Sequence, residues 1–378
     1  MKSFRTLKMG MVAGLLATAA FVQAAPPLQA QSFDRENRGP AKKMLQAKLE
    51  AMDWYASSEA MTLRFTLHNP TTESLWVMSW MLPSDDMDAN LFTVQRDGEA
   101  VTYLGPLVKR AAADVEDWIE IKAGQSYSIV FDPSASYDMT GKGQYAIQYR
   151  VNQIAVRHKA PQRALDPGSH LGMVKAQNAD TQPHGNASVV TASTELFYEG
   201  IPANAETKAQ ELTLIGGYTK CTTSQQAKLA TAHQNAINIS GKALSQLGTA
   251  NPFNFVWWFN TASTSSINNV QGHFSKINDA FANKAVTYDC SCKKRYYAYV
   301  YPTQPYKIYV CSVFWTAPDL GRDSKAGTLV HEMSHFNVVA STDDWVYGAT
   351  GAHSLALSDP TKAMDNADNH EYFAEDQK

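Results

Sequence analysis

One pentapeptide, His331-Glu332-Met333-Ser334-His335, constrains the fold of this chain more than any other feature. Side chains four positions apart share a face of an α-helix, so a helix would bring both imidazoles to one place. The preceding segment, Ala326-Gly327-Thr328-Leu329-Val330, is mostly apolar and compatible with a helix. We therefore expect a helix from about Ser324 to Asn337 that packs into a hydrophobic core.

The pentapeptide has the pattern HExxH, which is typical of a zinc site on a helix. Imidazole nitrogens are zinc ligands, and Glu332 follows the first of them, where its carboxylate can take a proton from water. A catalytic zinc site has three protein ligands and keeps one position for water. One class of zinc enzyme continues the motif as HExxHxxGxxH, which Val338 and Ser341 exclude here. The alternative is a surface helix with two hydrogen-bonded histidines.

The spacing alone leaves the third zinc ligand open. A glutamate on a later helix, Glu371 or Glu375, would serve. Asp344 would serve equally, since it lies nine residues after His335 and the chain could fold back to the metal. In that case Tyr347 could direct its hydroxyl at the oxyanion that develops during hydrolysis.

The N-terminus has the pattern of a secretory signal. Lys2, Arg5 and Lys8 form a positive segment, Met9–Val22 is a short apolar stretch, and Val22-Gln23-Ala24 is a small-x-small cleavage pattern. We expect a Sec-type signal peptide over residues 1–24, cut near Ala24. A membrane anchor is the alternative, but the apolar run is short and no stop-transfer pattern follows it.

Charge and hydropathy exclude two further classes of partner. The 33 basic and 36 acidic residues give a net charge of −3, so the chain has no basic field to hold nucleic acid. Beyond the N-terminus no run of eighteen apolar residues occurs, so we expect no membrane association of the mature chain. The expected location is outside the cell.

Export implies an oxidising environment, in which the four cysteines should form disulfides. A bridge between Cys290 and Cys292 would be strained, because only Ser291 separates them. Each should therefore reach Cys221 or Cys311, and we favour Cys221–Cys290 with Cys292–Cys311. A structural zinc cluster is the alternative, but the paired CxxC spacing is missing.

The chain changes character near its middle. At 378 residues we expect two to three domains. From about Met52 to Val151 apolar and polar residues alternate between turn signals such as Asn69-Pro70 and Asp97-Gly98, which predicts an all-β, antiparallel sandwich of immunoglobulin-like plan. A last strand could run from Ser188 to Tyr198. No candidate catalytic or metal-ligating cluster occurs in this part.

The polar stretch from Lys159 to Gln210 is otherwise typical of a linker, and helical periodicity follows it. We expect a mainly α (α+β) domain, with helices over Ser224–Leu247 and Ser265–Ala282 and two strands within Tyr296–Val313 that join at Pro302–Pro305.

The segment from about Gly217 to Gln377 resembles the deuterolysin and peptidyl-Lys metalloendopeptidase family, the aspzincins. The motifs that carry the resemblance are Gly327–Glu332, Ser334–Phe336, Thr342 with Asp344, Tyr347 and Gly348, Ala298–Pro302, Cys311 with Phe314, Trp315, Ala317 and Pro318, and Asn366–Glu375. Ser341 departs from the family pattern, which usually has glycine there.

The resemblance implies a zincin fold with one zinc ion per chain, held by His331, His335 and Asp344. It implies Glu332 as the general base and Tyr347 as support for the oxyanion. It also implies the two disulfides favoured above.

Substrate preference can be argued from the C-terminal helix. Asp368 and Glu371 are three positions apart and share a helix face, where two carboxylates would favour a cationic side chain. The alternative is a solvated face. The Asp-x-x-Glu-Tyr-Phe-Ala-Glu segment resembles the lysine-specific members of the family, which cut the bond before lysine. A broad-specificity deuterolysin-like protease remains the second possibility.

A separate domain before a secreted protease predicts a propeptide that assists folding and blocks the active site. We expect a propeptide over residues 25–207, with its sandwich at about 50–200, and a metalloendopeptidase domain over residues 208–378. The Thr207–Lys208 bond is the first candidate for self-processing and Thr219–Lys220 the second. Proteins and peptides are then the substrates, and the propeptide is an internal partner.

Two readings of other classes stay open. The sandwich could be a permanent adhesive or substrate-binding module, and the whole chain could be an exported binding protein with a structural zinc site. Glu332 beside a three-ligand site argues against the latter, because structural zinc sites close with four ligands.

Overall fold

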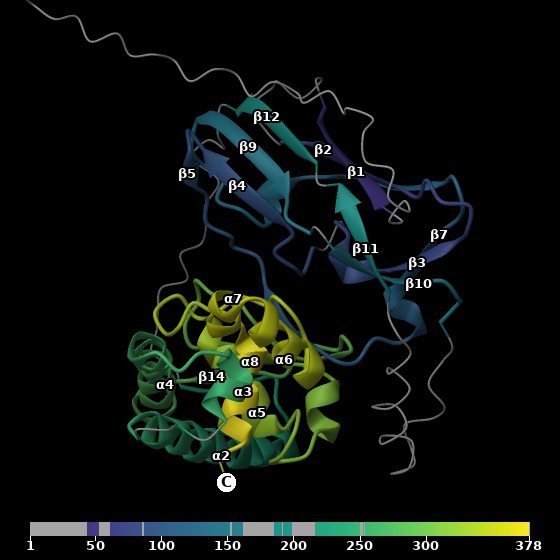
Figure 1. Cartoon of the computed structure of the whole chain (residues 1–378). Helices are drawn as coiled ribbons and strands as arrows, with labels where there is room; N and C mark the ends of the chain where they lie inside the picture. Colours follow the sequence, from purple (N-terminus) through teal and green to yellow (C-terminus); the bar gives the residue numbers. More distant parts are fainter. Residues whose placement is uncertain are drawn as a thin grey trace, which may run out of the picture. The chain divides into compact units, whose positions relative to one another are not determined.

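The computed structural model describes residues 44–52, 61–84, 87–151, 153–161, 185–190, 192–198, 216–249, 252 and 254–377. Strands come first along the chain and most helices come later, as the colours of Figure 1 show. The predicted signal peptide and the Thr207–Lys208 bond lie outside the described residues. None of the helices in the described ranges is long and apolar enough to span a membrane.

Two sheets make up the strand-rich region. The larger sheet has the order β7 (Trp118–Ile121), β3 (Leu75–Met78), β10 (Gln153–Arg157), β11 (Gly185–Val190), β1 (Met44–Ala51), β2 (Leu63–His68), β8 (Ser126–Phe131). The smaller has the order β12 (Ser193–Tyr198), β9 (Gly143–Tyr149), β4 (Phe92–Arg96), β5 (Glu99–Ala100). Short 3-10 turns lie between strands, at η2 (Ser79–Met81), η3 (Val115–Asp117) and η4 (Pro133–Ala135).

The alternation read from the sequence builds the core of this region. In β2, Phe65 is fully buried while Arg64 is exposed, because successive side chains of a strand point to opposite faces. The Phe65 ring lies 4.8 Å from the ring of Tyr149 on β9, so the two sheets share one apolar core.

Two details differ from the expectation. Ser188–Tyr198 is not one strand, because β11 pairs with β1 and β10 whereas β12 pairs with β9 of the other sheet. The backbone carbonyl of Ala192, between them, accepts a bond from the amide of Tyr149. The larger sheet is also not wholly antiparallel, since β1 and β11 run parallel. The segment crosses between sheets, which an alternation pattern alone does not reveal.

The second region is mainly helical, as expected. Its helices are α2 (Thr223–Leu247), α3 (Phe255–Phe259), α4 (Thr264–Asn283), α5 (Lys325–His335), α6 (Gly348–Ser358), α7 (Pro360–Met364), α8 (Ala367–Glu375) and the 3-10 turn η5 (Val313–Thr316). The expected helices α2, α4 and α5 are confirmed. A capping box at Thr222 and Gln225 begins α2, and the Ser263 side chain caps α4.

One small sheet accompanies these helices. Its order is β13 (Gly217–Thr219), β14 (Thr287–Asp289), β16 (Lys307–Val310), β15 (Tyr296–Val300), β6 (Leu107–Arg110). Disulfides Cys221–Cys290 and Cys292–Cys311 fasten its ends, and these are the pairs favoured from the sequence. Large apolar side chains such as Phe274 and Phe373 fill the space between the helices.

The strand β6 is the unexpected member of that sheet. It comes from the strand-rich part of the sequence, yet it pairs antiparallel with β15, with Lys109 opposite Ala298 and Leu107 opposite Val300. All four of its residues are buried. The edge of this small sheet is therefore closed by a strand from the first half of the chain.

Candidate functional site

The helix α5 places the HExxH motif in the core of the helical region. The Ser324 side chain caps it by accepting from the amide of Gly327 at 2.9 Å. Every residue from Lys325 to His335 is buried. This agrees with the expected core-packed helix and excludes the alternative of a surface helix.

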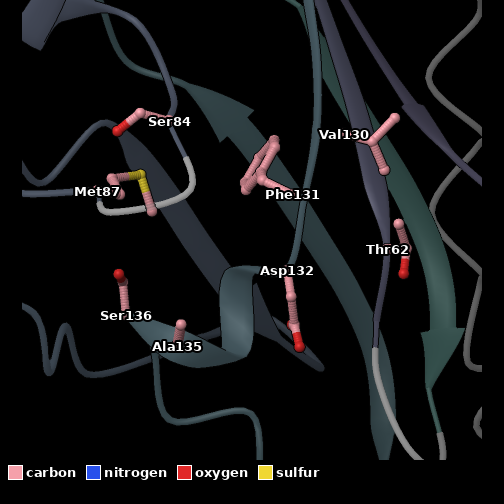
Figure 2. Close-up of a pocket in the computed structure, with 8 residues that line it drawn as sticks. All are labelled: Thr62, Ser84, Met87, Val130, Phe131, Asp132, Ala135 and Ser136. Atoms are coloured by element: carbon pink, nitrogen blue, oxygen red, sulfur yellow. The ribbon is translucent and has the colours of Figure 1, made fainter.

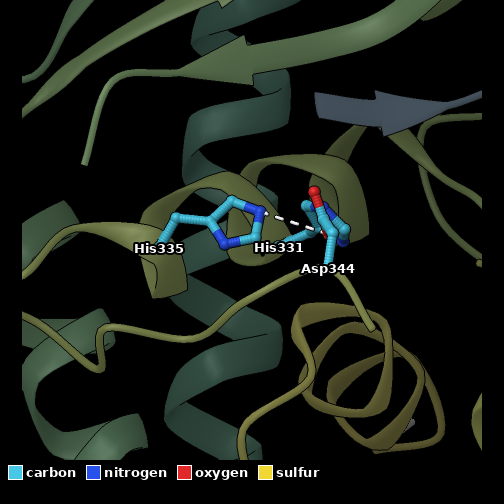
Figure 3. A group of neighbouring side chains, drawn as sticks. All are labelled: His331, His335 and Asp344. Atoms are coloured by element: carbon cyan, nitrogen blue, oxygen red, sulfur yellow. Dashed lines mark ion pairs between the residues drawn. The ribbon is translucent and has the colours of Figure 1, made fainter. Parts of the chain in front are cut away.

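Three side chains converge beside α5 (Figure 3). Asp344 Oδ1 lies 3.2 Å from His331 Nε2 and 3.5 Å from His335 Nε2. Asp344 reaches this place because the loop after α5 is tied to the start of α8. There Asp343 donates its amide to the Asp365 carbonyl and accepts from the Ala367 amide.

The chemistry of these atoms fits a zinc ion. Both Nε2 atoms and Asp344 Oδ1 are buried and make no hydrogen bond within the described part of the chain. Buried polar atoms without a partner are costly, and two imidazole nitrogens with one carboxylate oxygen are a zinc-ligand set. The fold thus brings Asp344, and neither Glu371 nor Glu375, to the two Nε2 atoms.

The opposite nitrogen of each imidazole is fixed by a further contact. His331 Nδ1 lies 2.8 Å from Asp368 Oδ1, and His335 Nδ1 lies 2.8 Å from the Thr342 carbonyl. Contacts of this kind orient metal-binding imidazoles and set their tautomer. Both Nε2 atoms are thereby held toward Asp344.

Burial and charge shift the titration of the group. Burial raises the pKa of Glu332 to about 7, partly offset by the neighbouring His331 and His335. Burial would also raise the pKa of Asp344, but the two imidazoles outweigh it and hold that pKa well below the ordinary value. Glu332 is therefore the group of this site whose carboxyl titrates near neutral pH, which suits a general base.

A cluster of three carboxylates lies next to the imidazoles, and we call Asp323, Asp368 and Glu371 the carboxylate cluster. It surrounds the ammonium of Lys109 on β6. Lys109 Nζ lies 2.5 Å from Glu371 Oε2, 3.3 Å from Asp323 Oδ1 and 3.4 Å from Asp368 Oδ1. His331, Asp368 and Glu371 could also gather round a cation, and the ammonium of Lys109 is the cation beside these carboxylates.

The backbone of β6 runs over the HExxH motif. The amide of Val108 donates to Asp344 Oδ2 at 3.0 Å, and the amide of Lys109 donates to Glu332 Oε1 at 3.3 Å. The amides of two consecutive residues of β6 therefore donate to one candidate metal ligand and to the candidate base, and the Lys109 amide of the Val108–Lys109 bond is the one that faces Glu332.

Arg110, the next residue of β6, holds the strand from the other side. Its guanidinium pairs with Asp88 of the strand-rich region at 2.6 Å. It also lies 5.0 Å from the ring of Trp80, 5.2 Å from that of Tyr296 and 6.0 Å from that of Tyr347. Tyr347 ends the loop before α6, and burial raises the pKa of its hydroxyl well above the ordinary value.

From the sequence we expected Asp368 and Glu371 on one face of a helix, and α8 places both beside the cationic side chain of Lys109. Asp323, Lys109 and Arg110 were not predicted as site residues from the sequence. Lys109 and Arg110 have no local signal, because their position depends on pairing with a distant strand. The turn-forming Gly321–Ser324 segment directly before α5 was the one available hint for Asp323.

A pocket in the strand-rich region offers no comparable chemistry (Figure 2). Its lining residues are Thr62, Ser84, Met87, Val130, Phe131, Asp132, Ala135 and Ser136. Asp132 is the one charged residue among them, and it accepts from the amide of Ser134 at the start of η4. The lining therefore brings together neither imidazoles nor paired carboxylates.

Comparisons with known proteins find similarity to metalloendopeptidases. A family model described as lysine-specific metallo-endopeptidase, of the aspzincin type, matches residues 245–375. An extracellular protease of Aeromonas hydrophila is 39% identical over 88% of this chain and 92% of its own length. A peptidyl-Lys metalloendopeptidase of Grifola frondosa is 33% identical over 76% of this chain and 80% of its own. A solved zinc peptidase from Grifola frondosa is 42% identical, covering 41% of this chain and 96% of its own, with a TM-score of 0.39.

We expect the protein to bind one zinc ion per chain through His331, His335 and Asp344. His335→Ala should weaken zinc binding by at least about 100-fold. Removing a group that only hydrogen-bonds a metal ligand already lowers metal affinity by about 10- to 100-fold, and His335 is proposed to be a ligand itself. Metal content and competition with a zinc indicator measure this. His353→Ala, on α6, is the matched control and should bind as the unaltered protein does. Stoichiometric, tight zinc in His335→Ala would contradict the ligand set.

Stability should depend on pH through Glu375. Burial, helped by the neighbouring Glu371 charge, raises the pKa of its carboxyl from 4.5 to about 9. Between these values the folded protein holds a proton that the unfolded chain has lost, so stability falls as the pH rises through this window. Glu375→Gln should flatten that fall, whereas the exposed Glu195→Gln should not. Denaturant midpoints at pH 5 to 9 measure it, and parallel curves for all three proteins would contradict it.

Proposed function

The chain belongs to the aspzincin family of zinc metalloendopeptidases, and from this premise we propose that it is a secreted endopeptidase that cuts peptide bonds before lysine. We propose further that it is made as a proenzyme whose strand-rich part, in an immunoglobulin-like sandwich, is an inhibitory propeptide. The observation that carries both proposals is the position of Lys109.

The strand β6 has the features expected of a bound substrate. An extended peptide that pairs with a free sheet edge gains backbone hydrogen bonds, and side-chain sites then give specificity. β6 pairs in this way with β15 and buries the lysine ammonium among carboxylates. If the cleft holds substrate as it holds β6, the bond before lysine lies where Val108–Lys109 lies.

The roles of the catalytic residues follow from this placement. Zinc held by His331, His335 and Asp344 would polarise the scissile carbonyl and lower the pKa of water. Glu332 takes a proton from the water whose oxygen attacks the carbonyl carbon. As the carbon–nitrogen bond breaks, Glu332 delivers that proton to the leaving amine.

Two contacts support these roles. Glu332 Oε1 already accepts from the amide of Lys109, the atom that corresponds to the leaving nitrogen. Its other oxygen is buried and makes no hydrogen bond within the described residues, so it can face the attacking water. We assign Tyr347 to the oxyanion, to which its hydroxyl would donate.

The strand-rich region is anchored well enough to act as an inhibitor. Besides the Arg110–Asp88 pair, Arg150 pairs with Asp343 at 2.9 Å, next to the proposed ligand Asp344, and its guanidinium lies 4.2 Å from the Trp345 ring. These contacts keep β6 in place. Activation then requires that the strand-rich region be released.

The surroundings of Thr219–Lys220 argue against the second of the two candidate processing bonds. Thr219 ends β13, its carbonyl accepts from the Cys290 amide, and Cys221 begins a disulfide two residues on. A cut at Thr219–Lys220 would need this sheet edge to open. We therefore propose Thr207–Lys208, which lies outside the described residues.

The cleavage preference can be tested on an unfolded protein substrate. We expect nearly all new N-termini made by the processed enzyme to be lysine, and Glu332→Ala to release none. Mass spectrometry of the peptides measures both. Broad cleavage would favour a deuterolysin-like protease and contradict the lysine assignment. No cleavage by either protein would favour an exported binding protein with a structural zinc site.

Release of β6 can be tested in the uncut chain. Lys109→Ala removes the ammonium and leaves the carboxylate cluster unpaired, so β6 should no longer block the site. We expect the intact variant to hydrolyse a short lysine peptide at least about 10-fold faster than the intact unaltered chain, which corresponds to the loss of about 1.4 kcal/mol of strand binding.

The exposed Lys122→Ala is the control and should stay as inactive as the unaltered chain. Intact mass before and after each assay shows that no processing has occurred. Equal activity of all three uncut chains would contradict an inhibitory role for β6 and favour a permanent binding module.

A further inference from the structure

We propose that Asp323 is the residue that selects the lysine ammonium, acting as a third carboxylate that reads the substrate without touching a zinc ligand. This inference rests on the proposed function and deepens it. It names the residue on which specificity can be changed while the catalytic centre stays intact.

The first argument is the match between donors and acceptors around the Lys109 ammonium. An ammonium has three N–H donors and accepts nothing. The carboxylate cluster offers three oxygens within 2.5 to 3.4 Å, one from each of its members. The rings of Tyr297 and Tyr372 lie 5.2 and 5.6 Å from Nζ and close the remaining sides. Without Asp323 one donor of a buried ammonium would lack a protein acceptor.

The second argument is that the three carboxylates of the cluster differ in whether they also contact His331. Asp368 Oδ1 lies 2.8 Å from His331 Nδ1, and Glu371 Oε2 lies 3.4 Å from the same atom. Both therefore contact a zinc ligand as well as the lysine. Asp323 contacts the lysine from the loop before α5, and its carboxylate accepts from Lys109 and the Tyr372 hydroxyl while its amide donates to Glu375.

The third argument is how the fold holds Asp323 in place. Its φ of 50° lies in the left-handed region, which costs energy for a residue with a Cβ. Glu375 accepts from the amides of Asp323 and Ser324 and from the Ser324 hydroxyl. The Tyr372 hydroxyl donates to Asp323 Oδ1 at 2.8 Å, the oxygen that faces Lys109. The surrounding hydrogen bonds thus hold Asp323 in a strained backbone conformation. Strained residues that are held in this way are found most often at functional sites.

The geometry also discriminates between lysine and arginine. Lysine carries a compact point charge with three donors, whereas a guanidinium is a planar fork that suits one carboxylate bound side-on. Three acceptors on three separate side chains, one from the loop before α5 and two from α8, match the former. Asp323 is also the most exposed of the three, at 32% against 1% for Asp368 and 0% for Glu371, so it lies nearest the solvent.

The test uses the processed enzyme and three peptides that differ only after the scissile bond, with lysine, arginine or methionine there. Asp323→Asn keeps the shape and the acceptor for Tyr372 but removes the charge. We expect kcat/KM for the lysine peptide to fall about 10- to 100-fold, mainly through KM, because a hydrogen bond to a charged group is worth that factor. The arginine and methionine peptides should change less than about threefold, and zinc content should stay at that of the unaltered enzyme.

Two further variants separate specificity from metal binding. Asp368→Asn should lose zinc affinity as well as lysine cleavage, since it orients His331. Asp279→Asn, on the exposed surface of α4, changes the net charge equally and should leave all three peptides unaffected. Calorimetry with the inactive Glu332→Ala enzyme gives a readout without turnover. Adding Asp323→Asn should weaken binding of the lysine peptide by the same factor.

Each outcome decides the matter. If the unaltered enzyme prefers lysine but Asp323→Asn keeps the same ratio between peptides, Asp323 does not select lysine. If Asp323→Asn loses zinc, its role is structural and the inference is wrong. If the unaltered enzyme does not prefer lysine, the proposed function itself fails, and the failure is visible before any variant is made.

Discussion

The burial of the Lys109 ammonium beside His331 is the interaction on which the arrangement of this molecule depends. Carboxylates are expensive to bury without a partner, and the carboxylate cluster places two nearly unexposed ones, Asp368 and Glu371, against a zinc-ligand set. A single cation offsets that cost. Burial would lower the pKa of Lys109, but Asp368 and Glu371 raise it well above its ordinary value, so the ammonium stays charged.

In the proposed proenzyme mechanism, this requirement for a cation links folding to function both before and after release of the strand-rich region. While the strand-rich region is attached, its own lysine satisfies the cluster. After the proposed release of that region, water or a substrate lysine would take the same place, and a substrate would bring strand pairing with β15 as well. Because the buried carboxylates need a cation to offset their charge, the same cluster would favour a cationic side chain of the substrate. Glu375 adds no charge at neutral pH, because its raised pKa keeps it protonated.

Part of this could be predicted from the sequence. The HExxH helix, α2 and α4 follow from local periodicity and capping, and the alternation in β2 and β9 predicts strands because one face of each is buried. The convergence of Asp344 on His331 and His335 needed the family resemblance, since spacing left Glu371 and Glu375 equally open. Two features could not be predicted from the sequence: that β11 and β12 belong to different sheets, and that Lys109 lies beside the HExxH motif. Both depend on which distant strand a short segment pairs with.

The same dependence would explain how β6, which carries a lysine, could inhibit the proposed lysine-specific site. Arg110 is tied to Asp88, and the amides of Leu104 and Gly105 donate to the Ser136 carbonyl at 2.8 and 3.2 Å. The residues on both sides of Val108–Lys109 are thus fixed to one folded region. If that bond were cut, the new ends would stay in place and could rejoin, whereas the ends of a free peptide diffuse apart. Preorganisation on a folded support would therefore make β6 a tight ligand and a poor substrate, as the proposed inhibitory role requires.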